Sequence, residues 1–159
     1  MSNTLPISAY SRQETVYIEL AIRFAMDAHG GKTDRYGNPA VLHALKVGLG
    51  TPSAVEMAAG FLHDTVETGA LTLDDLRKAG FPDEVVSIVD GLTRRAGEDW
   101  ETYICRVMES PAAMRVKLRD LEHNLDARRM RSFGPDDAER FERYLQAWIR
   151  IRTALEEFH

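Results

Sequence analysis

Apolar residues recur three and four positions apart along most of the chain. Between residues 14 and 29 the apolar positions include Val16, Tyr17, Leu20 and Phe24, which predicts an amphipathic helix. The same periodicity predicts further helices over 41–49, from Pro52 through Val66, from Thr72 to Gly80, and over 81–92, 100–109, 114–130 and 136–158. No segment alternates apolar and polar residues over a strand's length, so the predicted fold is all-α, a single compact helical bundle.

Glycine, proline and hydroxyl residues mark the expected boundaries of these helices. Gly30 and Gly31 are expected to end the first helix, and residues 32–39 (KTDRYGNP) have the composition of a surface loop. Thr51 followed by Pro52 is expected to open a helix, with Thr51 as the N-cap. Residues 1–13 lack a clear period, so we interpret them as an N-terminal arm and 14–159 as the domain.

The composition excludes several classes of protein. With 159 residues and 44% hydrophobic content, the chain is long enough for one domain with a full core. A net charge of -5 argues against general nucleic-acid binding, which needs a basic surface. The single cysteine, Cys105, excludes an intrachain disulfide, and we expect it in the core. We see no charged-then-apolar leader and no apolar run near ~20 residues. We therefore expect a cytoplasmic protein without a membrane partner, and its oligomeric state is not predicted.

The segment 61–69 (FLHDTVETG) carries the strongest candidate chemistry. In a helix, Glu67 lies over His63 and Asp64, because residues three and four apart share a face. An imidazole and a carboxylate suit a divalent cation, and the remaining carboxylate can then handle protons. The alternative is an ordinary exposed pair on a helix or in a capped turn.

A second polar group lies in the segment 115–124 (RVKLRDLEHN). Lys117, Asp120 and Asn124 share one helical face, while apolar residues on other turns can pack against the core. The alternative is the solvated face of an amphipathic helix.

His43 stands alone among apolar residues, a setting typical of core histidines, and His29, His123 and His159 have less to indicate a function. Three further arginines lie close together near a predicted helix end, where the helix dipole favours cations: Arg128, Arg129 and Arg131.

Taken together, His43, the pair His63-Asp64 and then Asp120 follow the H…HD…D pattern of the HD-domain metal-dependent phosphohydrolases. The chain resembles in particular the hydrolase domain of the RelA/SpoT family and its small stand-alone relatives, such as the metazoan SpoT homologue. Residues 28–43 are similar to that family's AHxGQxRKxGxPYIxHP segment, 61–69 to LLHDxxEDT, and 116–124 to VKLADxxHN. The three blocks occur in the family's order.

The resemblance implies a helical bundle with a metal centre, which in such proteins typically holds manganese. The implied metal ligands are His43, His63, Asp64 and Asp120. Such an ion would lower the pKa of a bound water and supply the nucleophile. Glu67 would orient that water or relay protons. The residues available for phosphate, ribose or base are Lys32, Arg35, Lys117, Asn124 and Arg128.

The chain departs from the family pattern at two places that matter for chemistry. Thr68 replaces the second acid of a Glu-Asp pair, and a hydroxyl can orient water without acting as a base near neutral pH. Asp34-Arg35 replaces an Arg-Lys pair, which adds a negative charge near the expected phosphates.

The predicted function is a manganese-dependent hydrolase of a small phosphorylated nucleotide, with guanosine 3′,5′-bis(diphosphate) as the first substrate. The alternatives are a phosphatase acting on NADPH or a deoxynucleotide, and a non-catalytic metal- and nucleotide-binding module.

Overall fold

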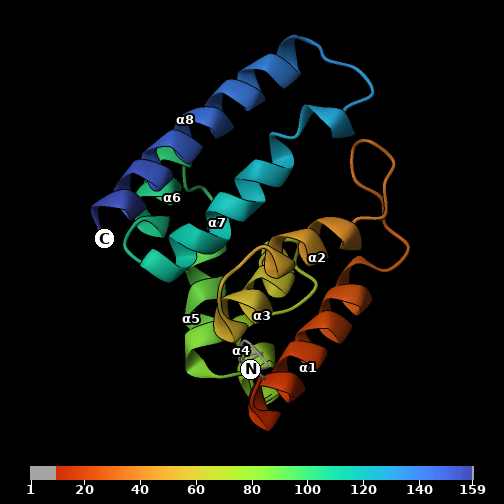
Figure 1. Cartoon of the computed structure of the whole chain (residues 1–159). Coiled ribbons are helices and arrows are strands. Elements are labelled where there is room, and N and C mark those ends of the chain that lie inside the picture. The colour runs from red at the N-terminus through yellow and green to blue at the C-terminus, as the bar shows by residue number, and fades with distance from the viewer. Residues whose placement is uncertain (1–9, 159) are drawn as a thin grey trace, which may run out of the picture.

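The computed structural model describes residues 10–158, and over this range the chain forms eight α-helices and one short 3-10 helix (Figure 1). In chain order they are α1 (Arg12–His29), α2 (Val41–Leu49), α3 (Ala54–Leu62), α4 (Leu73–Lys78), α5 (Asp83–Leu92), α6 (Trp100–Val107), α7 (Pro111–Asn124), η1 (Ala127–Arg129) and α8 (Pro135–Glu157). The described part of the chain has no strand beyond a single bridge between Thr33 and Pro39. The predicted all-α fold is therefore confirmed.

Helix α3 forms the centre of the bundle and packs against α1, α2, α5 and α7. Its sequence is almost wholly apolar, and Ala58, Ala59 and Leu62 are completely buried. Glycine allows α2 and α3 to approach closely, because a Cβ at Gly60 would lie 2.6 Å from the Cα of Gly48. This crossing brings the C-terminal end of α2 close to that of α3.

The last helix, α8, lies beside α7 and runs past α6 at the other end of the molecule from α1 (Figure 1). Only Ala147 and Ile151 of α8 are fully buried, so much of this helix faces solvent. No helix in the described range 10–158 combines the length and the hydropathy that a membrane crossing requires.

The predicted helix start at Thr72 is confirmed by its cap, because Thr72 accepts a hydrogen bond from the backbone N–H of Asp75. Helix α7 begins three residues before the predicted position 114, where Ser110 accepts a hydrogen bond from the backbone N–H of Ala113 and Pro111 opens the helix. Helix α5 begins at Asp83, directly after Pro82 and two residues later than predicted. At the N-terminus, residues 1–9 of the expected arm lie outside the described residues. Residues 12 and 13 belong to α1, which Ser11 caps.

The assignment of Thr51 as an N-cap was wrong. Its hydroxyl donates instead to the carbonyl oxygen of Gly48 at 2.7 Å, which satisfies the end of α2. Ser53 is the N-cap of α3 and accepts from the backbone N–H of Glu56. Cys105 was also placed wrongly, because it is exposed on α6.

Two helices end earlier than their periodicity predicts. Helix α3 stops at Leu62, and residues 63–69 form successive turns. Thr65 and Thr68 donate their hydroxyls to the carbonyl oxygens of Leu62 and Asp64, and such local bonds compete with a helix. Helix α7 ends at Asn124 and is followed by η1, so the predicted helix 114–130 is two elements.

Candidate active site

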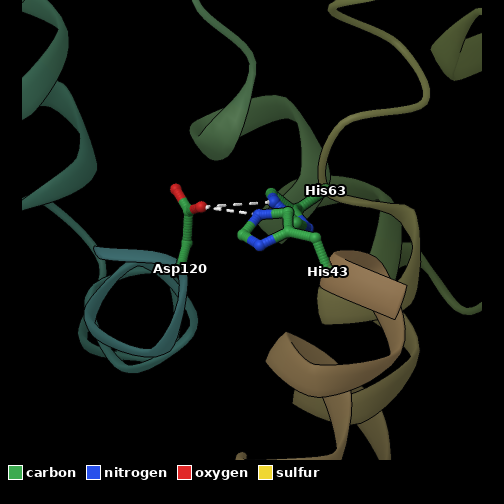
Figure 2. Close-up of side chains that lie close together, drawn as sticks. All are labelled: His43, His63 and Asp120. Atoms are coloured by element: carbon green, nitrogen blue, oxygen red, sulfur yellow. Dashed lines mark hydrogen bonds and ion pairs between the residues drawn. The ribbon is translucent and has the colours of Figure 1, made fainter. Parts of the chain in front are cut away.

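Three side chains from different parts of the chain converge between α2, α3 and α7 (Figure 2). His43 lies on α2, His63 directly follows α3, and Asp120 lies on α7. The Nε2 atom of His43 is 2.9 Å from Oδ1 of Asp120, and Nε2 of His63 is 3.6 Å from the same oxygen. The three can each offer one ligand atom, all within 4.8 Å of one another, so they can hold one metal ion.

The hydrogen bonding of His63 fits a metal ligand. Its Nδ1 lies 2.7 Å from the carbonyl oxygen of Gly60, which can only accept, so Nδ1 carries the proton. In the neutral ring Nε2 therefore presents a lone pair, and this buried atom has no hydrogen-bond partner among the described residues. A buried nitrogen without a hydrogen-bond partner beside two carboxylates fits a ligand of a cation.

Asp64 borders this cluster. Its Oδ2 atom lies 3.2 Å from Nε2 of His63 and 3.9 Å from Nε2 of His43. Burial lowers the pKa of His63, but the Asp64 and Asp120 carboxylates outweigh this effect and raise it well above the usual value. The carboxylates thus favour a positive charge at Nε2, whether from a proton or from a metal ion.

Lys117 neutralises the carboxylate of Asp120 from the side facing away from the histidines. Its Nζ lies 2.6 Å from Oδ2 of Asp120, and both side chains are buried. Burial alone would lower the pKa of Lys117, yet the neighbouring Asp120 raises it, so the ammonium stays charged. Asn124 donates to Oδ1 of Asp120 at 2.8 Å. Lys117 and Asn124, which were predicted to bind substrate, therefore both position the carboxylate of Asp120.

Glu67 and Thr68 follow Asp64 in the turns after α3. Partial burial and the Asp64 carboxylate raise the pKa of Glu67 above its usual value, which brings it closer to that of a general acid or base at neutral pH. The hydroxyl of Thr68 donates to the backbone carbonyl oxygen of Asp64 at 2.9 Å. Glu67 is therefore the better placed of the two for proton transfer.

The cluster opens into a cavity of about 490 Å³, a size typical of small-molecule sites. Among the predicted site residues, His43, Asp64, Glu67, Thr68, Asp120, Lys32, Arg35, Lys117 and Asn124 line this cavity. Arg128 does not, because it lies on the adjacent surface of η1 and pairs with Asp126 at 2.8 Å. The structure thus brings together the predicted site residues except Arg128. His63 does not line the cavity, but it joins the cluster through its contacts with Asp64 and Asp120.

Several cations that line the cavity were not predicted. Arg94 follows α5, Arg129 lies in η1, and Arg140 and Arg143 lie on α8. Within residues 10–158, neither Arg94 nor Arg143 forms an ion pair. Arg143 instead lies over the ring of Trp100, 5.1 Å from its centroid. An arginine that is not paired with a carboxylate can bind phosphate groups, and an aromatic ring beside it can stack on a base.

The charge of Asp34 is compensated inside the loop that carries it. The carboxylate accepts from the backbone N–H groups of Tyr36 and Asn38, and Arg129 donates to Oδ2 at 2.8 Å. Burial raises the pKa of Asp34, but these hydrogen bonds outweigh it and the pKa is lowered. Asp34 therefore fixes the loop against η1, and its negative charge is already paired with Arg129.

Sequence reasoning gave little weight to two histidines at this site. His29, at the end of α1, lines the cavity, and its Nε2 has no hydrogen-bond partner in the described structure. His123 contacts His43 directly. His123 follows Asp120 by one helical turn, a spacing that would have indicated a shared face. The Arg140, Arg143 and Tyr144 spacing on α8 carries a similar signal.

Comparison with known proteins connects this site to one group of enzymes. No family model matches the sequence. The chain is 36% identical over 122 residues to a GTP pyrophosphokinase of Streptomyces coelicolor, a match that covers 68% of this chain and 14% of the relative. It is 26% identical over 125 residues to a guanosine-3′,5′-bis(diphosphate) 3′-pyrophosphohydrolase of Aquifex aeolicus, covering 71% of this chain and 18% of the relative. The chain thus spans less than a fifth of either protein.

A solved structure shares the fold over nearly the whole chain. It is that of a metazoan ortholog of SpoT, a protein that hydrolyzes ppGpp and plays a role in starvation responses. The TM-score is 0.71 at 17% sequence identity, with 94% of this chain and 96% of that chain covered. The predicted resemblance to the RelA/SpoT proteins is confirmed by these sequence relatives and by this fold.

Proposed function

We propose that this relative of the RelA/SpoT proteins is a cytoplasmic, metal-dependent hydrolase that removes the 3′-pyrophosphate from guanosine 3′,5′-bis(diphosphate). The observation that carries the proposal is the convergence of His43, His63 and Asp120 at a cavity lined by arginines. The names of the sequence relatives support the choice of nucleotide. We assign the activity to the domain over residues 14–159.

We propose manganese as the metal, held by His43, His63 and Asp120, with Asp64 as the fourth protein ligand. Two imidazoles and two carboxylates suit such a borderline divalent ion. When bound, the ion would supply Lewis-acid chemistry toward water and a phosphoryl oxygen. The hydrogen bond of Nδ1 of His63 to Gly60 and the ion pair of Oδ2 of Asp120 with Lys117 leave Nε2 and Oδ1 to face the metal position.

In the proposed reaction, water adds its oxygen to the phosphorus that is bonded to the ribose 3′ oxygen. That P–O bond breaks, and the products are guanosine 5′-diphosphate and pyrophosphate. Glu67 takes the proton from the attacking water, since it borders the cavity beside Asp64 and has a raised pKa. The 3′ oxygen leaves and takes up a proton from solvent.

The cavity cations bind the phosphates of the nucleotide in this proposal. Lys32 and Arg35 approach from the loop that follows α1, and Arg94 and Arg143 approach from the opposite elements. Nearby, the rings of Trp100 and Tyr144 lie 5.3 Å apart and offer an apolar surface for a base. A small anionic nucleotide thus fits the charge of the cavity, although the whole chain is acidic.

The test is a hydrolysis assay with the purified protein. The protein is stripped with a chelator and supplied with Mn²⁺, and products of guanosine 3′,5′-bis(diphosphate) are separated by ion-exchange chromatography. We expect pyrophosphate release only with metal, and loss of release together with loss of bound Mn²⁺ in Asp120→Ala. Metal content is measured in parallel by elemental analysis. Equal metal content in Asp120→Ala and the unaltered chain would contradict the assignment of this ligand.

One observation favours a non-catalytic metal- and nucleotide-binding module as a second candidate. Thr68 replaces an acid of the family pattern, and its hydroxyl proton is used by a backbone carbonyl oxygen. A panel that adds NADPH and deoxynucleotides decides between the candidates. A metal-loaded protein that binds a nucleotide but turns over no member of the panel would support the binding module. Turnover of another nucleotide alone would instead change the substrate.

A further inference from the structure

Two imidazole rings meet edge to edge behind the candidate metal site. The Nδ1 atoms of His43 and His123 lie 2.7 Å apart. Their ring planes differ by only 17°, and the centroids are 5.0 Å apart. The separation of the centroids is this large only if both Nδ1 atoms lie on the line that joins the two ring centres. The rings are therefore nearly coplanar, and the in-plane lone pair of one nitrogen faces the N–H of the other.

A contact between two imidazole nitrogens at this distance holds one proton. One Nδ1 must donate and the other must accept, because two bare lone pairs or two N–H groups would repel each other. The direction follows from the other nitrogen of His43. That atom, Nε2, lies 2.9 Å from Asp120 and belongs to the candidate metal cluster. A metal ligand needs a lone pair at Nε2, so the proton of a neutral His43 lies on Nδ1.

We propose that His123 is a positioning residue that accepts the Nδ1–H of His43 and thereby fixes the orientation and tautomer of this metal ligand. The inference rests on the metal site of the proposed function and is independent of which nucleotide is the substrate. Partners of this kind orient metal-ligating histidines, and losing one typically costs about 10–100-fold in metal affinity. His63 already shows the same arrangement, with the carbonyl oxygen of Gly60 as its acceptor.

The surroundings of His123 hold it in place for this task. It lies in the last turn of α7, three residues after Asp120, so one helix supplies both a ligand and the partner of another ligand. Its carbonyl oxygen accepts a hydrogen bond from Nη1 of Arg129 at 2.8 Å. Arg129 is in turn paired with Asp34. The backbone that carries His123 is thus tied to the loop preceding α2.

Two substitutions of His123 test the role through binding of Mn²⁺ alone, measured by isothermal titration calorimetry. His123→Leu fills similar space without an acceptor, and it should weaken Mn²⁺ binding about 10–100-fold. His123→Asn retains an acceptor oxygen near the Nδ1 position, and it should restore affinity to within about threefold of the unaltered chain. Equal affinities in all three proteins, or equal losses in both variants, would overturn the inference.

A measurement on the unaltered chain decides the matter even if a variant does not fold. In the protein loaded with diamagnetic Zn²⁺, long-range ¹H–¹⁵N NMR correlations report which ring nitrogen carries the proton. We expect the proton of His43 on Nδ1 and that of His123 on Nε2. A proton on Nδ1 of His123 that faces a bare Nδ1 of His43 would overturn the inference. Failure of the unaltered chain to bind any metal would overturn both this role and the proposed function. Metal binding without nucleotide turnover would affect only the latter.

Discussion

Replacing Lys117 by methionine tests whether this residue neutralises the metal site or binds the substrate. The ammonium lies 2.6 Å from Oδ2 of Asp120, and only 9% and 8% of the two side chains is exposed, so water cannot take its place. Removing one partner of a buried ion pair costs about 3–5 kcal/mol. Asp120 keeps its hydrogen bond from Asn124, which places the expected loss near the lower end, about 3 kcal/mol.

The assay is thermal unfolding of the metal-free protein, followed by circular dichroism. For a chain of this size each kcal/mol corresponds to about 2–4 °C, so Lys117→Met should lower Tm by roughly 6–12 °C. Added Mn²⁺ should narrow the difference, since a bound ion supplies positive charge beside Asp120. Lys46→Met serves as the matched control, because Lys46 is exposed on α2 and its loss should change Tm little.

An unchanged Tm together with a raised KM would refute the charge-neutralising role of Lys117. If Lys117→Met melts within about 2 °C of the unaltered chain and instead raises KM for the nucleotide, Lys117 contacts substrate, as the sequence resemblance implies. A loss of stability without a change of KM supports the charge-neutralising role.

Three further predictions concern proton transfer, helix packing and acid stability. Glu67→Gln should lower kcat about 10²–10⁴-fold while Mn²⁺ content stays constant, and full activity in the metal-loaded variant would exclude Glu67 as the base. Gly60→Ala should destabilise the fold by roughly 1–3 kcal/mol in urea unfolding, because its Cβ would meet the backbone of Gly48, and unchanged stability would contradict this close packing. Hydrogen bonds from Arg106 and the backbone N–H of Arg95 lower the pKa of Glu98 from 4.5 to about 2, so its contribution is present above pH 4.5 and is lost as pH falls toward 2. Glu98→Gln should therefore show a smaller loss of unfolding free energy over this pH range, and parallel curves for the two proteins would refute the assignment.

The periodicity of apolar residues predicted most of the fold because most helices bury one continuous face. Helix α2 begins and ends at the predicted residues, and Thr72 caps α4 as expected. The end of α3 was missed, since apolar spacing continues to Val66 while the backbone leaves the helix at His63. Side-chain hydrogen bonds to carbonyl oxygens end that helix, and a periodicity pattern does not record them.

The sequence predicted those residues of the candidate site that belong to recognisable motifs. The spacing within 61–69 grouped His63 with Asp64, and the family resemblance added Asp120 and His43, next to which the fold brings them. Contacts between distant segments were not predictable in the same way. His123 acquires its role only by facing a histidine 80 residues earlier in the chain. The arginines of α8 reach the cavity because of how the last helix packs.

The packing of α8 also separates two groups of residues at the candidate site. The candidate metal ligands come from α2, α7 and the turn after α3, whereas Arg140, Arg143 and Tyr144 of the cavity wall come from α8. Under the proposed function, substitutions on α8 would change contacts to the phosphorylated compound and leave the candidate metal ligands in place. A mutant library confined to this helix would therefore test selectivity separately from metal binding.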